Sequence, residues 1–252
     1  MLLLNIREVS LSINHKRILR DLNLKIQENE IIGLIGPRGS GKTLLCDLLT
    51  GFYHSNMGKI IFAGENISNY SQDKINKLGI SRSFKESRLF DSISAIENIE
   101  IAFHSTINYN FFDIIFKTDN FLDQEKTIKE HSEELFNIFG ISDIRNEIVK
   151  NISIRLKKKL DIMRGLTSEP RVFILDNPTY GMSRQDSQEI IRLLEMINHK
   201  FRTALLIAEE DINVLVNICD RIAVMEHGTI LIVGKPAEIK NNQALMSMLI
   251  GN

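Results

Sequence analysis

The segment Gly36–Thr43 constrains the fold of this chain more than any other, because it matches the phosphate-loop pattern G-x-x-x-x-G-K-[ST] in full. The apolar run Ile31–Ile35 before it predicts a buried strand, and Leu44–Leu49 after it predicts a helix. In that order the glycines let backbone N–H groups turn toward phosphate oxygens, and the helix N-terminus adds positive partial charge. The expected phosphate-binding residues are Gly36, Pro37, Arg38, Gly39, Ser40, Gly41, Lys42, Thr43 and Leu44.

Two side chains of this loop have specific expected roles. Lys42 is expected to reach the outer phosphates of a nucleotide, and the hydroxyl of Thr43 is expected to bind Mg²⁺. The apolar run Val172–Leu175 predicts a second buried strand, which ends at Asp176. In P-loop proteins an aspartate at the end of such a strand holds Mg²⁺ opposite the loop hydroxyl. The sequence therefore predicts ATP and Mg²⁺ as cofactors, with Thr43 and Asp176 as metal ligands.

Composition and charge narrow the class of protein. A chain of 252 residues with 43% apolar residues can form one large α/β domain, or one domain with a subdomain. A net charge of −1 argues against a nucleic-acid partner, since proteins that bind DNA are usually clearly basic. Cys46 and Cys219 are too few for a disulfide framework, so we expect buried thiols. No apolar run approaches the roughly 18 residues that span a bilayer, which favours a cytoplasmic protein.

The distribution of apolar runs typical of β-strands indicates how the chain is divided into a core and a subdomain. Such runs alternate with helical segments, except over residues 86–165, where helical spacing continues without a clear strand. Ser94–Ile101 is expected to be a helix capped by Ser94, with Glu97 as its capping-box partner. We therefore expect a core of residues 1–85 and 166–252 that is interrupted by a helical subdomain of residues 86–165.

A second helix is expected within that subdomain, over Asp123–Phe139. Its apolar residues recur at helical spacing, which predicts one buried face. The residues of that face are Ile128, Leu135, Phe136 and Phe139.

Several further segments resemble one known family. They are Leu34–Pro37, Leu49–Tyr53, Arg82–Phe84, Arg88–Phe90, Glu97–Ile99, Leu175–Asp176, Cys219–Ile222, Gly228–Ile230 and Gly234–Pro236. Over nearly its whole length the chain resembles the ATP-binding subunits of ABC transporters, and most of all the branch that serves branched-chain amino acid importers. The resemblance implies an α/β P-loop NTPase fold of the ABC type, with a RecA-like core, an antiparallel β subdomain and a helical subdomain.

The resemblance also implies partners and a location. In this family two nucleotide-binding subunits sandwich two ATP molecules, and each ATP touches the phosphate loop of one subunit and the signature loop of the other. The implied partners are therefore a second nucleotide-binding subunit and transmembrane permease subunits. The implied location is cytoplasmic, on the inner face of the cell membrane through the permeases.

This chain departs from the family at most of the catalytic positions. The family glutamate after the Mg²⁺ aspartate is Asn177, the switch histidine is Glu210, and the Q-loop glutamine is Lys85. The signature Leu-Ser-Gly-Gly-Gln corresponds to Ile152–Leu156, in which Ser153 remains and Arg155 replaces a glycine. Two lesser departures are Ile13 for the adenine-stacking aromatic and Leu44 for a threonine.

These departures predict a pseudo-ATPase, with a degenerate Mg²⁺-aspartate motif. Asn177 cannot take a proton from water, and loss of a positioned general base costs about 10²–10⁴ in rate. Glu210 places negative charge where a γ-phosphate would lie, and the bulk of Arg155 opposes approach to the opposite ATP. We therefore expect binding of ATP with Mg²⁺ but slow or no hydrolysis. Since the base and the signature are lost from one chain, a heterodimer whose partner carries the hydrolysis is favoured over a homodimer.

Two alternative functions remain open. The chain would be an active ATPase that energises import of amino acids or other small solutes if Lys85, Arg155 and Glu210 together rebuild the site. It would be a non-transport scaffold if the fold serves interactions alone. Single-turnover hydrolysis separates the first alternative from a pseudo-ATPase, and co-purification with integral membrane proteins separates the second.

Two further segments invite an interpretation. Phe103–Phe121 is rich in aromatic residues, which indicates either a partner-binding surface or a loop packed on its own subdomain. The run Lys157–Lys159 is expected to lie on a solvated face of the signature helix.

Overall fold

The structure is a computed structural model, and it describes residues 1–104 and 118–250. Contacts within the chain divide it into two compact units. The first unit is formed by residues 1–85 and 170–252, and the second by residues 86–169. The expected aromatic surface Phe103–Phe121 falls largely on residues 105–117, outside the described residues.

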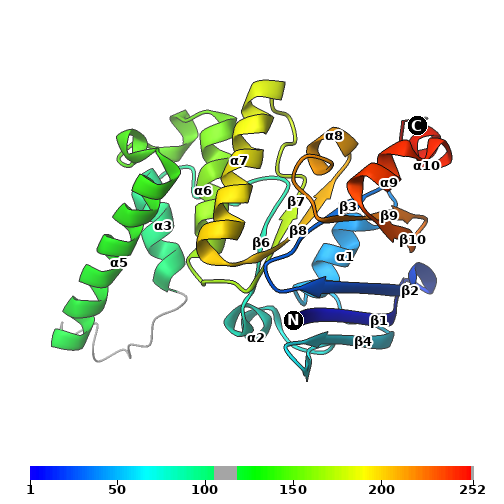
Figure 1. The fold of residues 1–252 in the computed structure, drawn as a ribbon. Coiled ribbons are helices and arrows are strands. Elements are labelled where there is room, and N and C mark those ends of the chain that lie inside the picture. The colour runs from blue at the N-terminus through cyan, green and yellow to red at the C-terminus, as the bar shows by residue number, and fades with distance from the viewer. Residues whose placement is uncertain (105–117, 251–252) are drawn as a thin grey trace. The chain divides into compact units, whose positions relative to one another are not determined.

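The first unit contains a six-stranded sheet in the order β10-β9-β3-β8-β7-β6 (Figure 1). Its strands are β3 (Ile31–Ile35), β6 (Ile80–Ser83), β7 (Val172–Asp176), β8 (Ala204–Glu209), β9 (Arg221–Glu226) and β10 (Thr229–Gly234). All neighbours are parallel except β9 and β10. Strands β3, β7 and β8 are buried along their whole length, which explains why they occur in the sequence as apolar runs. Their carboxyl ends meet at one edge of the sheet.

The second sheet of this unit is antiparallel, in the order β2-β1-β4-β5. Its strands are β1 (Leu2–Ile13), β2 (Lys16–Gln27), β4 (Met57–Phe62) and β5 (Glu65–Asn66). The turn between β1 and β2 has positive φ at Asn14 and His15, as a tight hairpin turn requires. The expected RecA-like core with an antiparallel β subdomain is thus confirmed.

Six helices complete the described part of the first unit. They are α1 (Lys42–Leu49), α2 (Gln72–Leu78), α7 (Arg184–Phe201), α8 (Ile212–Leu215), α9 (Pro236–Asn241) and α10 (Gln243–Ile250). Helix α7 begins after Ser183, whose hydroxyl accepts from the backbone N–H of Asp186. Cys46 and Cys219 are buried free thiols, as expected.

The second unit is helical where it is described. It contains α3 (Ala95–Phe103), α5 (Asp119–Phe139) and α6 (Ile154–Leu166), with short 3-10 turns at Ser142–Ile144 and Val149–Asn151. The capping box is confirmed, because Glu97 Oε2 accepts from Ser94 N at 2.7 Å and Ser94 Oγ accepts from Glu97 N at 3.4 Å. Helix α5 starts earlier than expected, and its predicted apolar face is buried.

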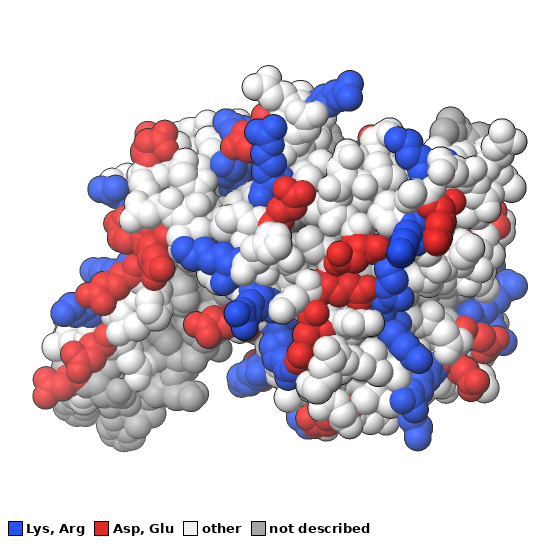
Figure 2. Space-filling view, in the orientation of Figure 1, with Lys and Arg blue, Asp and Glu red and all other residues white. Residues whose placement is uncertain are grey.

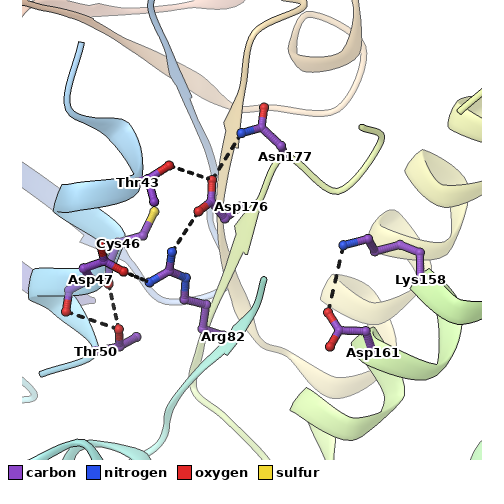
Figure 3. Close-up of polar contacts among 9 residues, drawn as sticks. All are labelled: Thr43, Cys46, Asp47, Thr50, Arg82, Lys158, Asp161, Asp176 and Asn177. Atoms are coloured by element: carbon purple, nitrogen blue, oxygen red, sulfur yellow. Dashed lines mark hydrogen bonds and ion pairs between the residues drawn. The ribbon is translucent and has the colours of Figure 1, made fainter. Parts of the chain in front are cut away.

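The prediction of a solvated lysine run on α6 was wrong for two of its three residues. Lys158 and Lys159 are buried. Lys158 Nζ lies 3.9 Å from the buried carboxylate of Asp161 (Figure 3). Lys159 Nζ donates to the backbone carbonyl oxygen of Phe139. Only Lys157 reaches outward, to Asp91 at 3.1 Å. A helix turns by about 100° per residue, so three consecutive side chains cannot share one exposed face.

Surface charge is mixed. Lys and Arg side chains lie interspersed with Asp and Glu on the face that Figure 2 shows, in keeping with the net charge of −1. No helix in the described ranges combines the length and apolarity that a membrane span requires.

Candidate functional site

The predicted phosphate loop connects the end of β3 to the start of α1, within the first unit. Gly41 is the N-cap of α1 with φ of 106°, and Gly39 has φ of 78°. Gly36 is needed for a different reason, because a Cβ there would lie 2.0 Å from the carbonyl oxygen of Met225 on β9. The loop is thus held close against β9, and Gly41, Lys42 and Thr43 at the start of α1 line a pocket.

The side chain of Lys42 is folded into this loop. Its Nζ donates to the carbonyl oxygens of Gly36 at 2.6 Å and Pro37 at 3.1 Å, and lies 3.5 Å from Ser40 Oγ. Burial lowers the pKa of Lys42, while the negative charges of Glu210 and Asp176 act in the opposite direction. The ammonium group is therefore held inside the loop by neutral carbonyl groups. A negatively charged phosphate oxygen would accept a stronger hydrogen bond from it than these carbonyls do.

Asp176 ends β7 and is the centre of a buried polar cluster (Figure 3). Its Oδ1 accepts from Thr43 Oγ1 at 3.4 Å and from Asn177 Nδ2 at 3.3 Å. Its Oδ2 accepts from Arg82 Nη2 at 2.8 Å, and the other end of that guanidinium donates to Asp47 on α1. The structure thus brings Thr43 and Asp176 together, and it adds an arginine that sequence reasoning missed as a site residue.

A pocket of about 470 Å³ opens beside the loop. Its lining includes Arg38, Lys42, Thr43, Lys85, Asn177 and Glu210. Lys85, Asn177 and Glu210, which the resemblance aligns with family catalytic positions, therefore lie in the lining of one pocket at the phosphate loop. Their positions in the sequence are far apart, and the parallel sheet brings them to one edge.

Each of these three residues has a partner in the first unit. Lys85 Nζ lies 3.8 Å from the ring centroid of Tyr180, a cation–π contact. Asn177 Nδ2 donates to Asp176 Oδ1 at 3.3 Å. Its φ of 46° is a left-handed conformation that asparagine adopts more easily than most residues. Glu210 Oε2 accepts from Arg38 Nε at 3.0 Å, so a carboxylate in the pocket is paired with a cation of the loop.

The residues that the resemblance assigns to the signature lie in the second unit. Ser153 is the N-cap of α6, and its Oγ accepts from Leu156 N at 3.4 Å. Arg155 lies in the first turn of that helix. Ser153 and Arg155, the two expected signature residues, are therefore both at the start of α6.

Glu209 is, after Arg82, the second residue of the site that sequence reasoning missed. It is 4% exposed, and its Oε1 accepts from Thr179 N at 3.0 Å and from Thr179 Oγ1 at 2.8 Å. Burial raises its pKa, and the hydrogen bonds from Thr179 act in the opposite direction. Glu209 joins the segment after β7 to the end of β8, next to Glu210. The only signal for it was its place as the first of three consecutive acids, Glu209–Asp211, at the end of an apolar run.

Replacing Glu209 by glutamine is expected to change the pH dependence of unfolding. The folded-state pKa of Glu209 is raised above the ordinary glutamate value of 4.5. The stabilisation from its bound proton is therefore complete below that value and is lost as the pH rises through the folded-state pKa. Relative to the Glu209→Gln variant, the wild type should become less stable as the pH rises above 4.5.

Urea unfolding at a series of pH values measures this difference. Glu134→Gln is the matched control, because it removes an exposed glutamate on α5. A difference between wild type and the Glu209→Gln variant that does not vary with pH would contradict the assignment, as would an equal trend in the control.

The chain matches the family described as ABC transporter over residues 19–180. It is 30% identical over 230 residues to the high-affinity branched-chain amino acid transport ATP-binding protein BraF of Pseudomonas aeruginosa, covering 91% of this chain and 90% of BraF. It is 29% identical over 231 residues to the high-affinity branched-chain amino acid transport ATP-binding protein LivG of Escherichia coli, covering 92% of this chain and 91% of LivG. A crystal structure of an ABC transporter ATP-binding cassette in its ADP conformation superposes with a TM-score of 0.87, at 20% identity and full coverage of both chains. The chain therefore belongs to the ABC transporter family and has the fold of its ATP-binding cassettes.

Proposed function

We propose that this chain is a nucleotide-binding subunit of an ABC transporter that binds ATP with Mg²⁺ and hydrolyses it poorly or not at all. The observation that carries the proposal is a pocket whose lining combines residues of the phosphate loop, Lys42 and Thr43 among them, with Asn177 and Glu210. The loop supports binding, and the other two residues argue against hydrolysis.

The residues of the loop and of β7 fit a nucleotide with its metal. The glycines leave backbone N–H groups open at the start of α1, and Lys42 is within reach of the same space. Hydroxyl and carboxylate oxygens are ligands that Mg²⁺ prefers, and those of Thr43 and Asp176 lie 3.4 Å apart. These two residues would hold the metal, which when bound would neutralise part of the phosphate charge.

The carboxylates around Asn177 are already engaged. Asn177 itself carries a neutral amide, which donates to Asp176 and cannot accept a proton from water near neutral pH. Glu209 is buried against Thr179, and Glu210 is paired with Arg38. Without a free, positioned base, hydrolysis is expected to be about 10²–10⁴-fold slower than with one.

The relatives support a transport role. BraF and LivG are described as branched-chain amino acid transport ATP-binding proteins. We infer that this chain pairs with transmembrane permease subunits on the cytoplasmic face of the membrane and with a second nucleotide-binding subunit. A partner with its own base and signature would carry any hydrolysis, which favours a heterodimer. The solute is expected to be an amino acid or another small solute.

A second candidate function is an active ATPase. The observation that favours it is the cationic side chain of Lys85 in the pocket, which adds positive charge near the phosphate loop. The Tyr180 ring holds that ammonium at 3.8 Å, so the residue is already positioned.

One experiment separates these functions. Labelled ATP is added to the purified chain with and without Mg²⁺, and bound nucleotide and released phosphate are measured in the same tube. We expect Mg²⁺-dependent binding without phosphate release. Steady phosphate release that Lys42→Ala abolishes would establish an active ATPase instead. No binding under either condition would leave the scaffold alternative, and co-purification with integral membrane proteins would then decide whether the chain serves a transporter.

A further inference from the structure

We propose that the Arg38–Glu210 ion pair makes the phosphate site favour a nucleoside diphosphate over a triphosphate. The inference rests on the proposed nucleotide binding and adds a preference that comes from this chain's own residues. Arg38 belongs to the phosphate loop, and Glu210 directly follows β8. Their side chains meet at 3.0 Å in the lining of one pocket.

The two partners are held very differently. The Arg38 side chain is 79% exposed, so solvent can replace Glu210 as its partner at little cost. The Glu210 side chain is only 31% exposed, and its backbone N–H donates to Glu209 Oε2 at 3.3 Å. Glu209 is in turn fixed by Thr179. The carboxylate of Glu210, which is less exposed and stands on an anchored backbone, is therefore the more fixed member of the pair, and Arg38 is the more movable one.

A fixed carboxylate sets the charge balance of the pocket. Arg38, Lys42 and Lys85 contribute positive charge to the lining, and Glu210 contributes negative charge. Each additional phosphate group brings more negative charge into the same space. Its interaction with Glu210 is repulsive at any distance within the pocket, and it is stronger than in bulk water because the pocket is partly shielded from solvent.

Movement of Arg38 does not remove this penalty. If Arg38 stays on Glu210, the added phosphate lacks that cation. If Arg38 turns to the added phosphate, Glu210 is left without its cation while facing a more negative ligand. Both arrangements disfavour the longer phosphate chain relative to the shorter one, so the pair acts as a selectivity element in either case.

The test compares affinities for ADP and for the non-hydrolysable analogue adenylyl imidodiphosphate, measured by calorimetry with and without Mg²⁺. The variant is Glu210→Gln, which keeps the size of the side chain and removes its charge. We expect the affinity for the triphosphate analogue to rise by at least roughly fivefold more than the affinity for ADP, because fivefold is the size of one charge interaction at about 4 Å in bulk water. The gap should be larger without Mg²⁺, because the ligands then carry more charge.

Two further variants make the result specific. Asp73→Asn removes an exposed acid of α2 outside the pocket and should leave the ratio of the two affinities unchanged. Arg38→Gln should weaken the triphosphate analogue more than ADP, and the Arg38→Gln/Glu210→Gln double variant should bring the ratio back toward that of the wild type, as coupled residues do. Melting temperatures check that each variant is folded.

The outcomes are distinguishable. An unchanged affinity ratio in the Glu210→Gln variant, with both ligands still bound, would overturn the selectivity role and leave the proposed function intact. A larger gain for ADP than for the triphosphate analogue would overturn it as well. Failure of wild type and variants to bind either ligand would overturn the proposed nucleotide binding, and this inference with it.

Discussion

Replacement of Arg82 by methionine is expected to lower the free energy of unfolding by about 3–5 kcal/mol, the usual cost of leaving a buried charge without its partner. The Arg82 side chain is 4% exposed and bridges Asp176, which is 2% exposed, to Asp47 on α1. Methionine fills a similar volume but offers no donor. The variant therefore leaves two carboxylates, one of them buried, without the guanidinium that now compensates both.

Arg171→Met is the matched control for this prediction. Arg171 also pairs with a carboxylate, at 2.9 Å from Glu28, but both side chains are partly exposed. Loss of such a surface pair is expected to cost less than about 1 kcal/mol. Urea unfolding of both variants measures the contrast, and equal losses would show that the Arg82 bridge contributes no more than a surface ion pair. If Arg82→Met does not fold, Arg82→Lys tests the same point, because one ammonium cannot reproduce a guanidinium that donates to two carboxylates.

The Arg82 bridge also orients Asp176, one of the two expected metal ligands. Asp176 Oδ2 is occupied by Arg82, while Oδ1 faces Thr43. The carboxylate that is expected to hold Mg²⁺ is thus oriented by an arginine before any ligand binds. The same contact stabilises the fold and fixes which oxygen faces the phosphate loop.

Strands of the core could be predicted where they are buried on both faces, because such strands consist of consecutive apolar residues. β3 and β7 were predicted from the apolar runs Ile31–Ile35 and Val172–Leu175, and the structure has them at Ile31–Ile35 and Val172–Asp176. β6 was missed, since its Ser81, Arg82 and Ser83 are buried polar residues. Local periodicity identifies a strand by apolar side chains, so a buried strand of polar residues, such as Arg82 paired with the distant Asp176, gives no such signal.

The residues of the candidate site also fall into those that the sequence predicts and those that it does not. The phosphate loop and the meeting of Thr43 with Asp176 could be predicted, because a contiguous motif and a strand end carry them. The roles of Arg82 and Glu209 could not, since each depends on partners more than 25 residues away in the sequence. The prediction for the lysines of α6 was wrong for a related reason. A run of like charges predicts side chains exposed to solvent, and only the packing of the helix shows which of these lysines are buried.

Rebuilding the family residues in the first unit alone is expected to give little gain in ATP hydrolysis. The variant carries Lys85→Gln, Asn177→Glu and Glu210→His, all in the lining of the pocket. Catalytic groups that act as a unit are strongly non-additive, so a restored base without a signature should leave phosphate release within about tenfold of the wild type. Single-turnover phosphate release at saturating ATP·Mg²⁺ measures this.

Adding the signature should produce a much larger change. With Ile154→Gly, Arg155→Gly and Leu156→Gln included, we expect phosphate release to rise by about 10²–10⁴, the contribution of a working general base. The glycines weaken the first turn of α6, so melting temperatures must confirm folding. Lys42→Ala in this background should abolish the gain, which ties it to the phosphate loop. If the unaltered chain already releases phosphate as fast as the rebuilt one, then Lys85, Asn177 and Glu210 form a working site of their own, and the chain is an ATPase that uses different groups from those of its family.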